Sequence, residues 1–398
     1  MRCVLPCCWI HVPWFGLLVP ENVFAHMIDL AILHEYALSI RQLCQSGVVF
    51  LSSVTLKDVA RKAGVSAMTV SASLHGTGRV SAERSEHIRK IARKMGYQPR
   101  VAAQMLSRKR TGQVGLLFIC STETSLSDIG ESGYTSPVLS SFVQVCEQEK
   151  LPYHIEYHLG QSPQEEFLPP RQLTGGLVDG ALVVGHPSSA MATWFEKHCS
   201  SPLVFVDEPG QYAVRSAVDQ GIHQAVMHLA ALGHQHIAYM GGPDRYITHE
   251  QGYLGFEQAC KAFSLKHPTQ DWLIHSENMS LHDLAQEYDQ VVARWWNRKI
   301  KPTAIVVHGV SSARALIGVL LQRGISIPND VSVIAYGASG DCKRTYPMLS
   351  GIEPDFHGIL QTALNMLNKL IVGKTVNPTH AAITPNLCIR DTVAAPTR

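Results

Sequence analysis

The chain has 398 residues, of which 45% are hydrophobic and 17% charged, with a formal net charge of +2. This length and hydrophobicity predict two or three domains with large cores and exclude a wholly disordered, collagen-like or coiled-coil protein. The chain contains no run of 18 apolar residues and no Cys-x-x-Cys pair among its ten cysteines, so we expect no membrane span, no zinc site and no disulfide scaffold, and a reducing cytoplasm is favoured.

The near-neutral total conceals an uneven distribution of charge. Residues 54–111 contain 13 Lys and Arg against 3 Asp and Glu, a net charge of +10, whereas residues 1–53 carry −1 and residues 112–398 carry −7. A compact basic segment beside an acidic body is typical of a nucleic-acid-binding head joined to a separate domain. A basic, solvated helix pair would give the same charge. The sequence pattern inside the segment must therefore distinguish such a pair from a nucleic-acid-binding head.

Residues 1–53 show no sequence pattern that relates them to the domains predicted after them. The apolar segment Trp9–Leu18 resembles the core of a signal peptide, but Pro13 interrupts it and only Arg2 precedes it. We therefore expect that the gene start is placed too early and that the mature protein begins near Leu51–Val54. Residues 1–53 are accordingly treated as an unassigned extension that is not made or not ordered.

Three short helices are predicted over residues 54–98. Gly64 suits the tight turn after the first helix, Ser66 is placed to cap a second helix over Ala67–Leu74, and Ser81 to cap a third. Three helices around one small core, with this charge, predict a helix-turn-helix DNA-binding domain, the alternative being an amphipathic helical hairpin. Apolar residues at helical spacing form the stripes of the first and third helices: Leu56, Val59, Ala60 and Ala63, then Ile88, Ile91, Ala92 and Met95.

The stretch LKDVARKAGVSAMTVSASL, followed by RVS and GYQP, resembles the head of the LacI/GalR family of bacterial transcription repressors. In that family the second helix enters the major groove of DNA. Phosphate contacts set the register of such a head and base contacts set its sequence preference. The resemblance implies base-reading positions at Ala67, Met68 and Ala72, and phosphate-contacting positions at Thr55, Ser66, Thr69, Ser71 and Tyr97.

The base-reading positions depart from the family pattern. Many members carry Arg or another hydrogen-bonding side chain where this chain has Ala72. Ala67, Met68 and Ala72 offer no bidentate donors to guanine, only apolar contact with thymine methyl groups. Sequence preference is therefore expected to be modest or to depend on DNA shape.

Residues 99–111 match the hinge of the same family. Arg100–Ser107 is too short for a stable isolated helix, but the resemblance implies that it folds when two subunits meet on DNA. Arg100 is included among the DNA-binding residues, and Leu106 falls at the position where paired leucines open the central base step. The alternative is a flexible basic linker in which Leu106 has no special role.

From Gln113 onward, apolar runs alternate with helical stretches such as Gly221–Leu232 and Ser311–Arg323. Such alternation predicts parallel sheets covered on both faces, and the number of strands indicates two similar lobes with a ligand between them. The fold class is thus a three-helix head and hinge followed by a two-lobed α/β domain over residues 112–398. The apolar runs are Val114–Ile119, Val178–Gly185, Leu203–Asp207, His236–Gly242, Ala304–Gly309 and Val331–Gly337.

Two stretches, SAVDQGIHQAVMHLAALGHQHIAYMGGP and RGISIPNDVSVIAYG, are similar to the periplasmic-binding-protein-like domain of the family. This resemblance implies effector binding and dimerisation by the two lobes. No heptad pattern follows Leu387, so a coiled-coil tetramer is not expected.

The positions that hold sugars in family members are altered. An Arg of the family aligns with Gly252, an Asn-Asp pair with Gly309-Val310, and an acidic pair with Gly337-Ala338. Because sugar hydroxyls need charged or amide partners, a simple hexose is disfavoured; a larger ligand, an apolar one, or none stays open. The candidate effector-binding groups, each more typical of an exposed loop residue than of a ligand contact, are Arg245, Tyr246, His249, His308 and Asp341.

An enzyme is the first rival function for an α/β body. The chain has no Gly-x-Gly-x-x-Gly turn, Walker loop or Gly-x-Ser-x-Gly elbow, and the nearest approach, Gly337–Gly340, is interpreted as a loop. We therefore predict no catalytic residue, no metal and no cofactor. The second rival is a periplasmic-type ligand-binding protein without a regulatory role on DNA, which the basic head argues against.

The sequence therefore predicts a homodimeric, sequence-specific regulator in the bacterial cytoplasm, more a repressor than an activator. Its expected partners are a pseudo-palindromic double-stranded DNA operator and a small-molecule effector, with no membrane.

Overall fold

The computed structural model describes residues 9–12, 17–20, 54–75, 80–97, 110–120, 133–159, 167–244, 246–265, 270–278 and 280–397. Contacts divide the chain into two units, Met1–Gln104 and Met105–Arg398. In the first unit, strands β1 (Trp9–Val12) and β2 (Leu17–Pro20) pair antiparallel. The predicted hinge falls almost entirely outside the described residues.

The three helices predicted for the head are confirmed as α2 (Leu56–Ala63), α3 (Ala67–His75) and α4 (Ala82–Lys94). Gly64 ends α2 with φ of 64°, the left-handed conformation that glycine adopts without strain. The core consists of Val59, Ala60, Val70, Ile88 and Ala92.

The first lobe of the second unit is a six-stranded parallel sheet in the order β13-β7-β6-β5-β3-β4. Helices α7 (Thr135–Glu149) and α15 (Phe356–Ile371) contribute to the core on one face, and α8 (Arg171–Thr174) and α9 (Ser189–Lys197) to the core on the other. The strands are β3 (Val114–Ile119), β4 (Tyr153–His158), β5 (Gly180–Val184), β6 (Leu203–Val206), β7 (Ala213–Ser216) and β13 (His380–Ile383).

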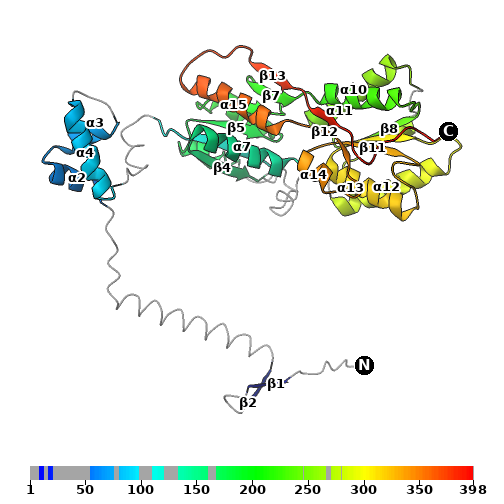
Figure 1. Ribbon diagram of the computed structural model, residues 1–398, viewed down its shortest axis with the longest axis horizontal. Helices are drawn as coiled ribbons and strands as arrows, with labels where there is room; N and C mark the ends of the chain where they lie inside the picture. The colour runs from blue at the N-terminus through cyan, green and yellow to red at the C-terminus, as the bar shows by residue number, and fades with distance from the viewer. Residues whose placement is uncertain are drawn as a thin grey trace. The chain divides into compact units, whose positions relative to one another are not determined.

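The second lobe is a six-stranded sheet in the order β14-β12-β11-β10-β8-β9, parallel except for β14. Helices α10 (Val218–Ala231) and α11 (Ile247–Ala262) cover one face, and α12 (Leu281–Trp296) and α13 (Val310–Gln322) the other. The strands are β8 (Ile237–Gly241), β9 (Leu273–His275), β10 (Ala304–His308), β11 (Ser332–Tyr336), β12 (Ser350–Glu353) and β14 (Asn386–Cys388). Figure 1 shows both lobes.

All six predicted apolar runs form strands, and both sheets are covered on both faces as predicted. One prediction was wrong: Ser339 and Gly340 are not part of a loop but begin the short helix α14 (Ser339–Lys343). The turn that follows Gly337 brings Ala338 into an extended conformation directly before this helix. A strand-end glycine alone does not reveal that a helical turn follows.

The chain passes between the lobes three times. It leaves the first lobe after β7 to form α10, returns after β12 to form α15, and leaves again after β13 to form β14. The carboxyl ends of β6 and β7 in the first sheet lie next to that of β11 in the second, because Asp207 and Ser216 both act on Tyr336.

Candidate nucleic-acid interface and ligand site

Helix α3 has one face in the core of the head and one in solvent. Val70 is buried in the core, whereas Met68 is 82% exposed. Residues three and four apart share a helix face, so Ser71 and Ala72 lie on the side of Met68, with Ala72 half-buried. The exposed face of α3 therefore presents a thioether and a methyl group, without a bidentate hydrogen-bond donor.

The predicted phosphate-contacting hydroxyls cap the helices of the head. Thr55 caps α2, its Oγ1 donating to Asp58 Oδ2 at 2.6 Å. Ser66 caps α3, with Oγ accepting from the backbone N–H of Thr69 at 3.1 Å and 2.8 Å from Thr69 Oγ1. Helix N-termini carry unpaired N–H groups and a positive dipole end, so Ser66 and Thr69 lie at a place suited to a phosphate.

Tyr97 is half-buried and packs against the core of the head. Exposed cations surround the three helices, including Lys57, Lys62 and Lys90. The structure therefore places the predicted DNA-binding residues of the head on one small basic domain. The remaining two, Arg100 and Leu106, lie outside the described residues.

The two lobes of the second unit touch at a place we call the lobe junction. It consists of Tyr134, at the start of α7, Asp207 and Glu208, after β6, Ser216, at the end of β7, and Tyr336, at the end of β11. Ala338 of the second lobe packs into the core of the first. A β-carbon on Gly133 would lie 3.7 Å from Asp341 Oδ2, so α14 also reaches the first lobe.

Asp207 is 4% exposed and is held by two donors. The hydroxyl of Tyr134 donates to its Oδ2 at 2.9 Å, and the backbone N–H of Ser216 donates to its Oδ1 at 2.6 Å. Burial nevertheless raises the pKa of Asp207 and that of Glu208, whose Oε2 lies 3.2 Å from Nδ1 of His186. Burial also holds the phenol pKa values of Tyr134 and Tyr336 well above their usual range.

The predicted effector-binding residues of the second lobe form two groups. His308 is 5% exposed at the end of β10, and its ring stacks between those of His249 and Tyr336 at centroid distances of 4.1 and 4.7 Å. Tyr246 precedes α11, with its ring centroid 6.1 Å from that of His249. Asp341 lies in α14, within 4 Å of the cations of Arg314 and Arg344.

These locations exclude the exposed-loop alternative for His308, which is buried in a strand, and for His249, which lies in α11. His249 Nδ1 accepts a hydrogen bond from the backbone N–H of Gly242 at 2.9 Å. Burial and the neighbouring His249 hold the pKa of His308 well below its usual range, so His308 is neutral. Arg245 lies outside the described residues.

Two of the altered pocket positions have a steric explanation. A β-carbon on Gly252 would overlap the hydroxyl of Tyr239 and lie 2.8 Å from His308 Nδ1. A β-carbon on Gly337 would overlap a methyl group of Val310. Larger neighbours therefore fill the space in front of these glycines, and neither position can take a charged side chain without a shift of the residues behind it.

Sequence reasoning missed Tyr134, Asp207, Glu208 and Tyr336 as members of one site. Asp207 and Glu208 directly follow the apolar run of β6, at the carboxyl end of a parallel strand, and this position alone could have identified them. No comparable indication exists for Tyr134, because its partner Asp207 is 73 residues away. Within the described ranges, no three His, Cys, Asp or Glu side chains group as metal ligands, and no helix is long and apolar enough to cross a membrane.

A comparison with known protein families finds one match in each of the two units. Residues 55–100 match the bacterial regulatory proteins, lacI family, and residues 226–393 match the periplasmic binding protein-like domain. The first match covers helices α2, α3 and α4. Residues 55–100 thus carry the DNA-binding head of the lacI family, and residues 226–393 a periplasmic-binding-protein-like domain.

Curated relatives extend over nearly the whole chain. The lactose operon repressor of Escherichia coli K12 is 26% identical over 362 residues, covering 87% of this chain and 92% of the relative. The HTH-type transcriptional repressor PurR of Vibrio vulnificus is 26% identical over 352 residues, covering 85% of this chain and 98% of the relative. Both of these relatives are transcriptional repressors.

Solved structures support the same fold. The lac repressor dimer bound to operator and the anti-inducer ONPF aligns with a TM-score of 0.70 at 22% identity, covering 86% of this chain and all of that one. The complex of the transcriptional regulator CelR with cellobiose aligns with a TM-score of 0.60 at 20% identity, covering 85% of this chain and all of that one. The LacI-like fold, a helix-turn-helix head with a two-lobed α/β domain, is thus shared across the chain.

Proposed function

We propose that this chain is a homodimeric transcriptional repressor whose affinity for an operator is changed by a small molecule bound at the lobe junction. The observation that carries the proposal is a lacI-family head, with the exposed face of α3, in the same chain as the two-lobed domain. The lac repressor is described with operator and with small ligands, and CelR with cellobiose. We infer that in this chain, too, the head binds the operator and the two-lobed domain binds the small molecule.

In this proposal residues 54–98 bind the major groove, residues 99–111 form the hinge, residues 112–398 bind the effector and dimerise, and residues 1–53 stay unassigned. Hydroxyl groups at the ends of α2 and α3 contact phosphates, and Met68 and its neighbours contact base edges. Effector binding changes how the lobes close and hence how the hinge folds, a coupling typically worth about 1–3 kcal/mol.

The proposed site of action is the bacterial cytoplasm, where a repressor meets the chromosome. A catalytic role is not part of the proposal, because the named relatives are repressors.

Selection of bound DNA from a random duplex pool tests the proposal, using residues 54–398 at a stated salt concentration. We expect enrichment of one palindrome with a flexible central step, because two heads related by a dimer axis bind two inverted half-sites. If no sequence is enriched and binding is lost as salt rises, the head contacts only the DNA backbone and the proposed function is wrong.

The role of the hinge is tested by Leu106→Ala. Removing a leucine wedge should weaken operator binding at least about tenfold, equal to ~1.4 kcal/mol of binding free energy. Leu321→Ala is the matched control, because Leu321 is a half-exposed leucine of α13, far from the hinge in sequence. Unchanged operator affinity in Leu106→Ala would contradict the wedge and favour a flexible linker.

A further inference from the structure

At the lobe junction, the buried carboxylates of Asp207 and Glu208 are not matched by an equal number of buried cationic groups among the described residues. Asp207 and the side chain of Glu208 are both 4% exposed. In the described part of the chain, the cationic or basic groups that act on them are the imidazole of His186, against Glu208, and the guanidinium of Arg215, near Asp207. Arg215 is already engaged by other partners, at 2.7 Å from Gln251 Oε1 and 3.4 Å from Asp219 Oδ1.

Among the described residues of the second lobe, none acts on Asp207 or Glu208 as a cation. Where sugar-binding members are expected to place an Arg, this chain has Gly252, and the space in front of it is filled by Tyr239 and His308. His308 is buried and neutral, because desolvation and the neighbouring His249 lower its pKa. Buried carboxylates without a matching cation are unfavourable unless a partner supplies the charge.

Two buried hydroxyls at the same place point to a missing partner. Tyr336 is 5% exposed and Ser216 is fully buried, and neither hydroxyl has a hydrogen-bond partner of good geometry among the described residues. The two hydroxyls face each other, and the ring of Tyr336 lies close enough to Asp207 to feel its charge. Buried polar groups are normally satisfied, so these oxygens are suited to a ligand that donates hydrogen bonds.

We propose that the lobe junction binds a small organic cation, a primary amine whose ammonium group sits on Asp207 and Glu208 between the rings of Tyr134 and Tyr336. An ammonium supplies the missing charge and has three donors, which matches the carboxylates and the unsatisfied hydroxyls. Tyrosine faces attract cations. The inference rests on the proposed regulatory function, because it names the chemical class of the effector.

Thermal unfolding of the full chain at pH 7.5 tests this inference. The probes are ethanolamine, butylamine and 1,4-diaminobutane, with butanol, butyrate and glucose as neutral and anionic counterparts. A ligand that binds only the folded state raises Tm with concentration, so we expect at least one amine to raise Tm and to change operator affinity about tenfold. A rise in Tm with butanol, butyrate or glucose but none of the amines overturns the inference, as does no rise with any probe.

Substitutions of residues at the lobe junction test whether the amine binds there. Asp207→Asn and Glu208→Gln should each weaken amine binding at least tenfold in calorimetry, and Tyr336→Phe severalfold. Because Tyr336→Phe removes only a hydroxyl, whose neighbour is the hydroxyl of Ser216, it keeps the test decisive if Asp207→Asn fails to fold. Glu196→Gln, an exposed carboxylate of α9 in the first lobe, is the matched control and should bind the amine normally.

Amine affinity that survives both Glu208→Gln and Tyr336→Phe overturns the inference. The outcome is separable from that of the proposed function. A protein that selects an operator but ignores amines disproves only the effector class, whereas a protein that binds the amine but selects no DNA disproves the regulatory function.

Discussion

Met68 is the residue through which the head is expected to distinguish one base pair from another. It is 82% exposed on α3, with no hydrogen-bonding side chain at Ala67 or Ala72 beside it. Apolar side chains recognise the C5-methyl group of thymine, and one buried methyl group is worth about 0.8 kcal/mol. Replacing a contacted thymine by uracil in the selected operator should therefore weaken binding roughly fourfold.

The same substitution should have no effect on the variant Met68→Ala, which lacks the contacting side chain. Fluorescence anisotropy with the four combinations of protein and operator measures this coupling. If the unaltered protein binds uracil and thymine operators equally tightly, Met68 does not contact the methyl group.

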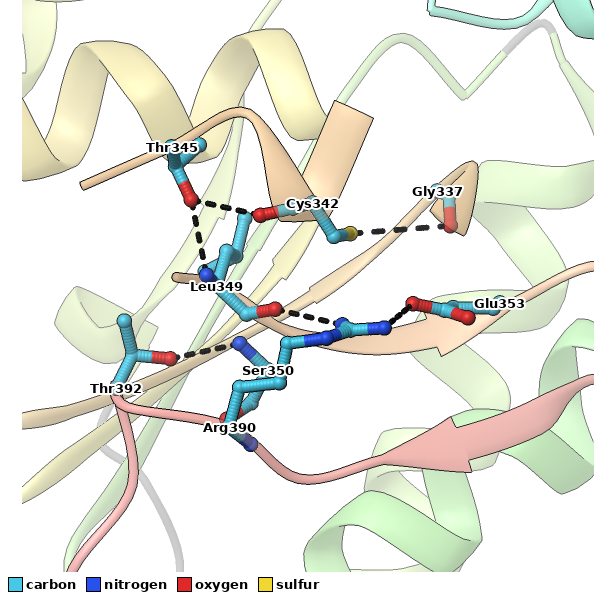
Figure 2. A network of polar contacts seen from close by, with 8 residues as sticks. All are labelled: Gly337, Cys342, Thr345, Leu349, Ser350, Glu353, Arg390 and Thr392. Atoms are coloured by element: carbon cyan, nitrogen blue, oxygen red, sulfur yellow. Dashed lines mark hydrogen bonds and ion pairs between the residues drawn. The ribbon is translucent and has the colours of Figure 1, made fainter. Parts of the chain in front are cut away.

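Arg390 joins the C-terminal segment to the second sheet through a largely buried ion pair. Figure 2 shows its guanidinium between the carboxylate of Glu353 and the backbone carbonyl of Leu349, to which it donates at 2.8 Å. The two side chains are 12% and 10% exposed. Arg390→Met leaves the Glu353 carboxylate buried and unpaired, so we expect the free energy of unfolding to fall by about 3–5 kcal/mol.

Urea denaturation of the full chain measures this loss. Arg323→Met is the matched control, because Arg323 pairs with Asp289 at 2.7 Å on the surface of the same lobe and exposed pairs contribute little. Equal losses in the two variants would contradict a special role for the buried pair.

His308 should make the stability of the second unit depend on pH. Its pKa is well below the usual value in the folded protein because the ring is buried, whereas the unfolded chain binds a proton near pH 6.5. Since the unfolded state then holds more protons, the free energy of unfolding should fall as pH drops below about 6.5, by at most ~1.4 kcal/mol per pH unit.

Urea denaturation from pH 7.5 to 5.5 tests the sign. His308→Gln should reduce the slope, and His282→Gln, which alters an exposed histidine of α12, should leave it unchanged. A slope that His308→Gln does not alter would assign the pH dependence to other groups.

At the scale of the element, the caps of α3 and α4 are alike in geometry but not in expected function. Ser66 Oγ accepts from Thr69 N–H at 3.1 Å, and Ser81 Oγ accepts from Arg84 N–H at 3.3 Å. Each loss of a cap costs about 1 kcal/mol, so Ser66→Ala and Ser81→Ala should destabilise the head to a similar extent.

Only Ser66 is among the proposed phosphate contacts, so only Ser66→Ala should weaken operator binding beyond the effect of its lost stability. Amide hydrogen exchange in the full chain reports the stability of the head, and anisotropy at low temperature reports affinity. The same loss of affinity in both variants would refute a phosphate contact by Ser66.

At the scale of the whole molecule, the uneven distribution of charge predicts that salt affects DNA binding strongly and the stability of the two-lobed unit weakly. Residues 54–111 carry +10 and residues 112–398 carry −7. Counterion release predicts that a head contacting 6–10 phosphates loses about 10³–10⁵ in affinity between 50 and 200 mM salt. The unfolding free energy of the two-lobed unit should change little over this range, because its stability comes mainly from buried apolar side chains.

Filter binding and urea denaturation at the same salt concentrations compare the two responses. DNA binding that persists unchanged at 200 mM salt would show that phosphate contacts do not dominate the interaction.

The head was predictable almost to the residue because the forces that define it are local. The apolar stripe of α2, the turn at Gly64 and the caps Ser66 and Ser81 each act within a few residues of the backbone that they shape. The six apolar strands of the lobes were predictable for a similar reason, since a continuous apolar run requires burial on both faces of a sheet.

The lobe junction was decided by tertiary structure. The bond between Tyr134 and Asp207 spans 73 residues, and the burial of His308 depends on α11 and β11, which come from separate parts of the chain. The short strands β13 and β14 carry no long apolar run and form because the third crossing brings them to the edges of two different sheets. The sequence by itself determined the three helices of the head, the six long apolar strands and that the head binds DNA, because those depend on local pattern and charge. Only the fold decided which polar groups meet between the lobes, because their partners are distant in sequence and their pKa values depend on burial.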